Sequence, residues 1–370
     1  MQTRVSRHVG SVALTVGAFA LLATPTRSIL AQGSCKGRPA EHTPACDTTP
    51  APPPFAPTGW KTVAMDHFTM ATADYKKETA YYATLMNWKV RSDDGKQAVL
   101  DIDDIGTVII RGGYEAPARP APQTRPAGDS AGGGRRGGRG GGNRAPVNAV
   151  WDSFAWQIAP WDAKKVQAEL EKRGLHPVAE NDGKGCEAFH VKDPDGFDVV
   201  LDNGCYAKAR KANARKPGLA VEAPFEKTNW QTVWLDHISF AVTNYKETAA
   251  WYKALLGWMP QGDEGSQNET WMCEDCGNII IRGGNPNDTR RPPPTVRRAV
   301  INHISFGIRP FDADQTKADL DTRGLSARMD TGGSKDIHDP TAYYKSYHTT
   351  TAMGWDLQIS NGSKENRTVR

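Results

Sequence analysis

The chain has 370 residues, of which 38% are hydrophobic and 24% charged, with a formal net charge of +4. This balance is typical of a soluble globular protein with about two domains. The net charge is too small to imply a nucleic-acid partner, and much of it lies in one low-complexity stretch.

The N-terminus has the pattern of a secretory signal. Arg4 and Arg7 precede an apolar run over residues 12–23, which is followed by small residues. The run is too short to span a bilayer as a mature helix. The pattern predicts a cleaved signal peptide over residues 1–31, export to the periplasm or beyond the cell, and no stable membrane insertion. Residues 32–57, rich in Pro and Thr, are expected to be extended.

Export changes how the six cysteines are interpreted. An even number of cysteines in an oxidising compartment indicates disulfides. The natural pairs are Cys35 with Cys46 and Cys186 with Cys205. The CxxC at residues 273–276 is weak evidence for zinc, because no second pair or nearby ligand accompanies it. A small disulfide, a redox pair and two free thiols all stay open there.

Two internal repeats organise the rest of the chain. Residues 66–88 align with 236–258 without a gap, and residues 149–175 align with 299–325. Duplication on this scale decides the fold before any single element does. The sequence therefore consists of four related units in two pairs.

Each unit opens with a strictly alternating strand. In LDHISFAV (235–242), bulky apolar residues alternate with His237, Ser239 and Ala241, and INHISFGI (301–308) repeats the pattern. One face is apolar and can pack under a helix, while the other carries small residues and one histidine and suits the lining of a cavity. A helical segment and short strands follow, so each unit is predicted to be βαβββ.

The units predict an α+β protein with two domains, at residues 58–206 and 228–362. A Lys-, Arg- and Ala-rich linker at 207–227 joins them. The Gly/Arg-rich stretch 118–147 interrupts the first pair and is expected to be a solvated loop. An RGG-type nucleic-acid segment is the weaker interpretation, because no aromatic residues are interleaved. The order of units leaves open whether each pair closes on itself or exchanges units.

Paired βαβββ units of this kind resemble the vicinal oxygen chelate superfamily, which includes glyoxalase I, extradiol dioxygenases and the fosfomycin and bleomycin resistance proteins. The resemblance implies two glyoxalase/dioxygenase-like, cup-shaped domains, in which a divalent metal chelates two neighbouring oxygens of the substrate. The motifs that carry it are Asp66-His67, Asp236-His237, Asn302-His303, Asp193-Pro-Asp-Gly196 and Gly354-Trp-Asp-Leu-Gln358.

The resemblance implies a metal site in the second domain. His237 and His303 correspond to the ligands on the first strands, and Gln358 stands where the family has a last-strand carboxylate. Extradiol dioxygenases place two histidines and a glutamate on iron or manganese, whereas some glyoxalase I enzymes use glutamine. A neutral carbonyl lowers metal affinity. The implied cofactor is a divalent ion, with Fe²⁺, Mn²⁺, Zn²⁺ and Ni²⁺ all open.

The first domain has a degenerate site by the same comparison. It keeps His67, but Ser153 replaces the second histidine and Val200 replaces the acid. Near the last strand of the second domain, Tyr347 and His348 are candidate catalytic residues, as hydrogen-bond donor or general acid.

Two functions are compatible with these expectations. The first is an exported metal-dependent lyase, isomerase or ring-cleaving dioxygenase that acts on a small substrate with vicinal oxygens. The alternative is a non-catalytic protein that binds or sequesters a small molecule and has a vestigial metal site. Homo-oligomerisation remains open, and no nucleic-acid partner is expected.

Overall fold

The computed structural model describes residues 49–117, 147–181, 183, 185–286 and 293–368. The predicted signal peptide, the Cys35–Cys46 pair and nearly all of the Gly/Arg-rich insertion lie outside these residues. In the described part of the chain, no helix is long and apolar enough to cross a membrane.

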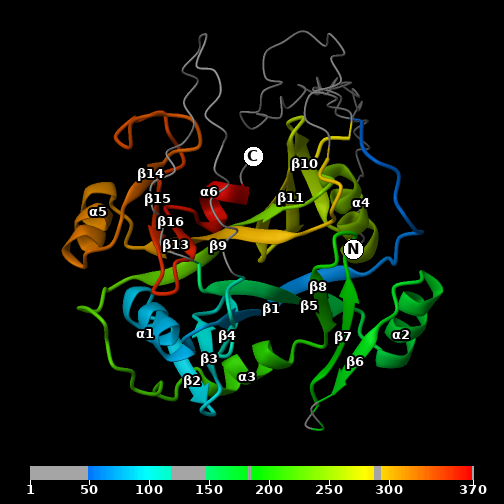
Figure 1. The fold of residues 1–370 in the computed structure, drawn as a ribbon, viewed down its shortest axis with the longest axis horizontal. Helices are drawn as coiled ribbons and strands as arrows, with labels where there is room; N and C mark the ends of the chain where they lie inside the picture. The colour runs from blue at the N-terminus through cyan, green and yellow to red at the C-terminus, as the bar shows by residue number, and fades with distance from the viewer. Residues whose placement is uncertain (1–48, 118–146, 182, 184, 287–292, 369–370) are drawn as a thin grey trace, which may run out of the picture.

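Four βαβββ units follow one another, as the repeats predict (Figure 1). A further helix follows the last strand of units two and four. The elements are β1 (Lys61–Thr72), α1 (Tyr75–Leu85), β2 (Lys89–Asp93), β3 (Gln97–Ile102) and β4 (Gly106–Arg111); β5 (Ala149–Ala159), α2 (Ala163–Lys172), β6 (Val178–Asn181), β7 (Glu187–Lys192), β8 (Asp198–Asp202) and α3 (Cys205–Asn213); β9 (Gln231–Ala241), α4 (Tyr245–Leu256), β10 (Met259–Asp263), β11 (Gln267–Cys273) and β12 (Gly277–Arg282); and β13 (Val300–Arg309), α5 (Ala313–Thr322), β14 (Arg328–Asp330), β15 (Ser346–Thr350), β16 (Asp356–Ser360) and α6 (Lys364–Thr368).

Local sequence sets where the helix of each unit begins. Each has an Asp or Asn at its N-cap, whose side chain accepts a hydrogen bond from a backbone N–H in the first turn. These N-caps are Asp74, Asp162, Asn244 and Asp312. Capping thus recurs at equivalent positions and supports the fourfold repeat.

Each pair of units closes on itself into one eight-stranded sheet. The strand orders are β2-β3-β4-β1-β5-β8-β7-β6 and β10-β11-β12-β9-β13-β16-β15-β14. The first strands of the two units pair antiparallel at the centre, and each first strand pairs parallel with the last strand of its own unit. This pairing answers the question that the order of units left open.

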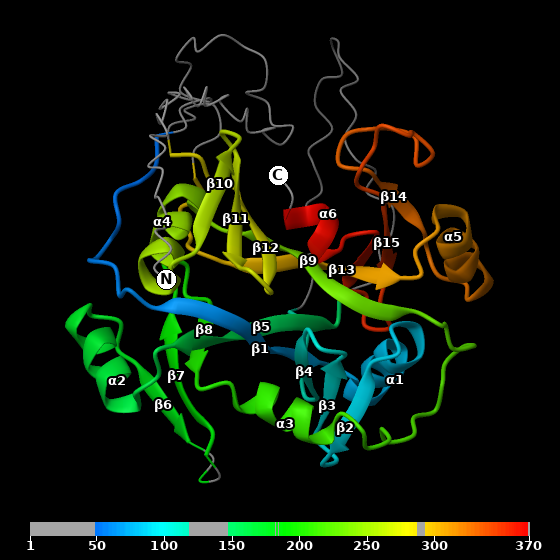
Figure 2. The ribbon, with the colours of Figure 1, turned by 180° about the vertical axis from the view of Figure 1, so that it is seen from behind.

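The two sheets pack back to back through their apolar faces, so the two cups open in opposite directions (Figures 1 and 2). Phe68 and Phe154 of the first sheet, and Phe240 and Phe306 of the second, are fully buried in one continuous core. The rings of Phe154 and Phe240 lie 6.0 Å apart across the interface. The alternation that defines these apolar faces leaves the opposite, polar faces to line the cups.

Equivalent residues from the two domains make equivalent bonds across the interface. The Trp88 indole donates to Thr232 Oγ1 at 2.9 Å, and the Trp258 indole donates to Thr62 Oγ1 at 2.9 Å. Both tryptophans are buried, and hydrogen-bonded indoles of this kind are strong packing anchors. The recurring tryptophans are therefore core residues.

Glu78 of α1 is a buried carboxyl at this interface. It accepts a hydrogen bond from the backbone N–H of Met353, in the hairpin between β15 and β16, at 2.9 Å. Burial raises the pKa of Glu78 to about 7, whereas an unfolded glutamate titrates near about 4.3. Folding therefore favours the protonated form. Its stabilisation is full below the unfolded pKa and is lost as the pH rises to the folded value, at about 1.4 kcal/mol per pH unit.

Glu78→Gln is expected to remove most of this pH dependence. Between about pH 5 and pH 8, the loss in unfolding free energy should be about 2 kcal/mol smaller in the variant than in the wild type. Urea unfolding at the two pH values measures this difference. The exposed Glu222→Gln serves as the control and should behave like the wild type. Equal pH dependence in all three proteins would show that Glu78 does not titrate in this range.

Two disulfides are present among the described residues, and one of them is an expected pair. Cys186 pairs with Cys205, which joins the β6–β7 region to the start of α3, and Cys273 pairs with Cys276 between β11 and β12. The CxxC is thus a small disulfide.

Candidate metal centre in the second cup

The second sheet brings His237 and His303 together on its concave face. His237 lies in β9 and His303 in the neighbouring β13, and their Nε2 atoms are 3.2 Å apart. The small side chains of Ser239 and Ala241 alternate onto the same face as His237. The two imidazoles therefore lie where the cup is lined by small residues, as the sequence predicts.

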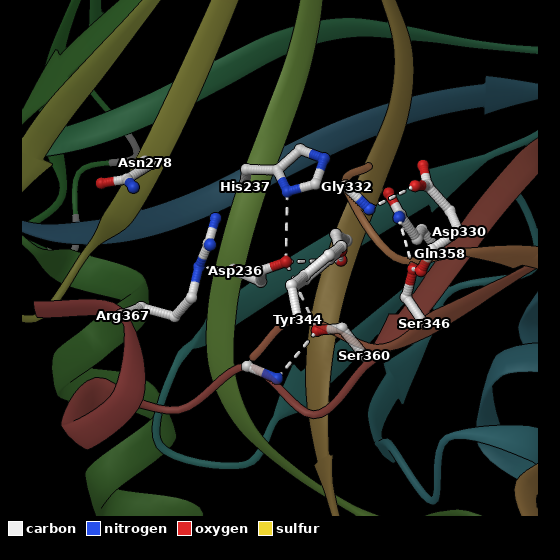
Figure 3. A network of polar contacts seen from close by, with 12 residues as sticks. Asp236, His237, Asn278, Asp330, Gly332, Tyr344, Ser346, Gln358, Ser360 and Arg367 are labelled. Carbon is white, nitrogen blue, oxygen red and sulfur yellow. Dashed lines mark hydrogen bonds and ion pairs between the residues drawn. The ribbon is translucent and has the colours of Figure 1, made fainter. Parts of the chain in front are cut away.

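A bulge in β9 explains how Asp236 contacts its own neighbour His237. In the pairing with β13, Ser305 lies opposite His237 and Phe306 lies opposite Leu235, so Asp236 has no partner residue. An extra residue of this kind bends the strand and re-aims the local side chains. The Asp236 carboxylate accepts a hydrogen bond from His237 Nδ1 at 3.1 Å (Figure 3). It also accepts one from Ser305 Oγ at 2.9 Å.

Arg367 of α6 balances the charge of the buried Asp236. Its Nε lies 2.6 Å from Asp236 Oδ1, and its guanidinium lies over the Tyr344 ring. Burial would raise the pKa of Asp236, but the charge of Arg367 and the hydrogen bonds from His237 and Ser305 outweigh it and hold this pKa well below its usual range. An ionised Asp236 keeps the proton of His237 on Nδ1 and leaves the Nε2 lone pair available to a metal.

His303 is held in the neutral form. Burial, followed by the charges of neighbouring basic groups, lowers the pKa of His303 to about 2. Neutral imidazole is the metal-binding form. Two nitrogens bound to one ion at about 2.1 Å each lie about 3.0–3.4 Å apart, and the observed separation of 3.2 Å falls in that range. The histidine pair fits one divalent ion.

Gln358 remains the candidate third donor. It occupies one row of the sheet with Ser305 and His237, across β16, β13 and β9. Its Nε2 donates to Ser346 Oγ at 2.8 Å, whereas its Oε1 is buried and has no hydrogen-bond partner among the described residues. A buried carbonyl oxygen without a partner is costly, and a bound ion would satisfy it.

His348 lies in β15, directly beside Gln358. Its Nδ1 is 2.8 Å from Asp356 Oδ1, and its Nε2 is 3.4 Å from Asp330 Oδ2. Burial would lower the pKa of His348, but the bonds to Asp330 and Asp356 outweigh it and raise this pKa. Donor atoms of His303, His348 and Asp356 also lie within 4.8 Å of one another, which gives a second possible donor set.

Tyr347, the other candidate catalytic residue, lies away from this cluster. Strand alternation turns Tyr347 to the face opposite His348, where it is buried in the core on the side of α5. Tyr344 reaches the cup instead: its hydroxyl is 3.3 Å from Ser305 Oγ and its ring lies 6.5 Å from the His237 ring. The candidate tyrosine is therefore three residues earlier in the chain.

The first cup is filled by its own chain. Helix α3 packs on β1 and β4 and lies between the two halves of the first sheet (Figures 1 and 2). The backbone N–H groups of Tyr206 and Ala207 donate to Asp66 at 3.2 and 2.8 Å, and the Tyr206 ring lies 4.4 Å from the His67 ring. Residues 207–213 of the expected linker thus form part of the helix that fills the cup.

The first cup lacks the two-histidine arrangement. Ser153 lies where the second cup has His303, and Val200 lies where it has Gln358. Donor atoms of Asp66, His67 and Asp202 do come within 4.8 Å of one another. Burial and the charge of Asp66 raise the pKa of Asp202 well above its usual range. A carboxyl group that shares a proton with its neighbour explains this cluster without a metal.

The carboxylate bonds of His348 also recur in the first cup. There His190 lies 2.9 Å from Asp198 and 2.8 Å from Glu180, and the hydrogen bond with Asp198 is the main cause that raises the pKa of His190 to about 9. Since the first cup has no histidine pair, this arrangement links three strands independently of a metal. Any catalytic role of His348 is therefore additional to a structural one.

Comparison with known proteins supports the fold. No family model matches the chain, and no curated protein matches its sequence. The Mn(II)-bound glyoxalase from Novosphingobium aromaticivorans matches at 14% identity and a TM-score of 0.50, over 81% of this chain and 82% of that one. A catechol 2,3-dioxygenase matches at 13% and 0.50, over 82% and 89%, and BphC, a halotolerant catechol dioxygenase, at 12% and 0.50, over 82% and 87%. The chain has the paired-domain fold of these glyoxalase and dioxygenase structures.

Proposed function

We propose that this chain is an exported enzyme that uses one divalent metal ion to act on a small substrate with two neighbouring oxygens. His237 and His303 hold the ion through Nε2, and Gln358 Oε1 is the third donor. The observation that carries the proposal is the 3.2 Å separation of the two Nε2 atoms beside the buried Asp236. The signal-like N-terminus and the disulfides support an oxidising compartment.

The donor set is compatible with several ions. Two imidazoles and one neutral oxygen suit several divalent metals, including Mn²⁺, Fe²⁺, Zn²⁺ and Ni²⁺. Mn²⁺ is the first to test, because the similar glyoxalase structure is Mn(II)-bound. When bound, such an ion supplies Lewis acidity that polarises the substrate oxygens.

The residues of the chain control position and protons around that ion. Asp236 fixes the tautomer and orientation of His237, and Arg367 fixes Asp236. The ring of His348 lies 4.9 Å from that of His303, beside the proposed ion, and its two nitrogens contact Asp356 and Asp330. His348 is therefore the proposed general acid. Tyr344 is the proposed hydrogen-bond donor in place of Tyr347.

A binding protein with a vestigial metal site is the second candidate, and the neutral Gln358 favours it. Gln358→Glu tests both functions. The added charge should tighten Mn²⁺ binding by about tenfold or more, since charge attraction is strong in a buried site. Chelator competition measures the affinity, and turnover of catechol with Mn²⁺ or Fe²⁺ measures activity.

Metal binding and turnover, measured together with a control variant, distinguish an enzyme from a binding protein. Gln315→Glu, on the exposed side of α5, adds the same charge away from the site and should leave metal affinity unchanged. Turnover of vicinal diols by the metal-loaded wild type supports the enzyme. Tight metal and diol binding without turnover in either protein supports the binding function. The metal site itself is refuted if neither the wild type nor Gln358→Glu binds an ion.

A further inference from the structure

Near the metal centre, the second cup contains a hollow lined by two arginines. The hollow has a volume of about 600 Å³, and Arg282, Arg298, Asn302, Gln267 and Ala241 contribute to its lining. This volume lies within the range of small-molecule sites. The arginines make the hollow positively charged.

Arg282 lies on the same face of the sheet as the histidine pair. It is opposite Ala241 in the pairing of β12 with β9, while Ser239 of β9 is opposite His303 in β13. Ala241 and Ser239 are two residues apart, so the row of Arg282 is about 7 Å along the strand from the row of His303. This spacing is close to that between the oxygen atoms of two groups attached at opposite ends of one six-membered ring.

Among the described residues, no counter-charge lies at contact distance from the guanidinium of Arg282. Its Nε is buried without a hydrogen-bond partner, and among the described residues no carboxylate lies within ion-pair distance of it. Glu264 and Asp330 are the acidic groups whose charges act on it from farther away. A half-buried arginine in this state favours an external anion as its partner.

The equivalent arginine of the first cup has a different partner. Arg111 occupies the position of Arg282, because it pairs with Ala71 as Arg282 pairs with Ala241. Arg111 forms an ion pair with Asp152.

The residue equivalent to Asp152 in the second cup is Asn302. Each occupies the same bulge, since neither has a partner residue where β5 crosses β1 and where β13 crosses β9. The sequence thus replaces the internal carboxylate of the first cup by a neutral amide beside Arg282. It also places Arg298 where the first cup has Asn148.

We propose that Arg282, assisted by Arg298, binds a carboxylate of the substrate. The substrate is then a small acid whose carboxylate lies across one six-membered ring from its two vicinal oxygens. This inference rests on the proposed function for the position of those oxygens. A planar carboxylate is the anion that best matches the two parallel donors of a guanidinium.

Two probes that differ only in the carboxylate test the proposal. Catechol and 3,4-dihydroxybenzoate are titrated calorimetrically into the Mn²⁺-loaded protein. The wild type should prefer 3,4-dihydroxybenzoate by about tenfold or more, as expected for a charge-assisted bidentate contact. In Arg282→Gln this preference should fall below about twofold, while catechol binding stays within about twofold of the wild type.

Two further variants make the comparison specific. Arg111→Gln removes the equivalent arginine of the first cup and should keep the full preference. Asn302→Asp rebuilds beside Arg282 the carboxylate that the first cup contains, and it should abolish the preference as Arg282→Gln does. Equal affinity for the two probes in the metal-loaded wild type, or a preference that survives both Arg282→Gln and Asn302→Asp, would overturn the inference.

Metal content is measured for every protein, so that a missing metal site can be distinguished from a missing carboxylate site. If no ion binds, the proposed function fails, and benzoate is then titrated into the metal-free protein. Benzoate binding that is lost in Arg282→Gln and kept in Arg111→Gln still supports a carboxylate site. No binding, or binding that does not depend on Arg282, refutes it.

Discussion

Replacing His237 and His303 together by alanine is expected to reduce bound Mn²⁺ from about one ion per chain to less than about a tenth of that. The two Nε2 atoms lie 3.2 Å apart, and His237 is oriented by the ionised Asp236. Removing both histidines leaves Gln358 as the sole remaining donor of the proposed set. Elemental mass spectrometry of protein purified without chelators measures the loss.

The chain provides a matched control in its first cup. His67→Ala combined with His190→Ala also removes two histidines, but from the cup that α3 fills, and this variant should keep its metal. Circular dichroism of both double variants checks that they are folded. Equal metal content in the two would place the ion elsewhere. Loss of metal in His348→Ala alone would instead select the set of His303, His348 and Asp356.

Asp236→Asn is expected to lower the free energy of unfolding by about 3–5 kcal/mol, the usual cost of leaving one member of a buried ion pair alone. Asp236 is fully buried, and its Oδ1 lies 2.6 Å from Arg367 Nε. The remaining acidic neighbour of Arg367, Glu269, is farther away at 3.8 Å. Urea unfolding of the metal-free protein measures the change.

A second substitution identifies the cause. Arg367→Leu in the Asp236→Asn background removes the stranded charge and should restore part of the lost stability, giving a coupling energy of at least about 1 kcal/mol. The same Asp236→Asn variant should bind Mn²⁺ about 10–100-fold more weakly, because His237 loses its orienting carboxylate. A stability loss below about 1 kcal/mol would show that Arg367 does not depend on Asp236.

The repeats made the fold and the histidine pair predictable. The gapless alignment of 66–88 with 236–258 and the alternation around His237 and His303 depend only on local periodicity, which survives in a single sequence. The same periodicity placed the apolar face that packs between the domains. These features needed no knowledge of long-range contacts.

The residues around the histidine pair could not be predicted from the periodicity of the sequence. A bulge at Asp236 breaks the two-residue period, so its bond to His237 could not be derived from alternation. Arg367 lies in a short helix that follows the last strand, where no pattern indicated a partner. The resemblance offered Tyr347 and His348 together, but neighbouring residues of a strand face opposite sides, and one residue of register reverses the face.

The residues that fill the first cup correspond in position to the substrate proposed for the second cup. Tyr206 of α3 lies against the ring of His67, and Asp152 lies against Arg111. An aromatic ring and a carboxylate thus already occupy the positions that a small aromatic acid is proposed to take in the second cup. The first domain therefore resembles the proposed complex of the second domain with its substrate. In this comparison Tyr206 stands for the ring of the substrate, and Asp152 stands for its carboxylate.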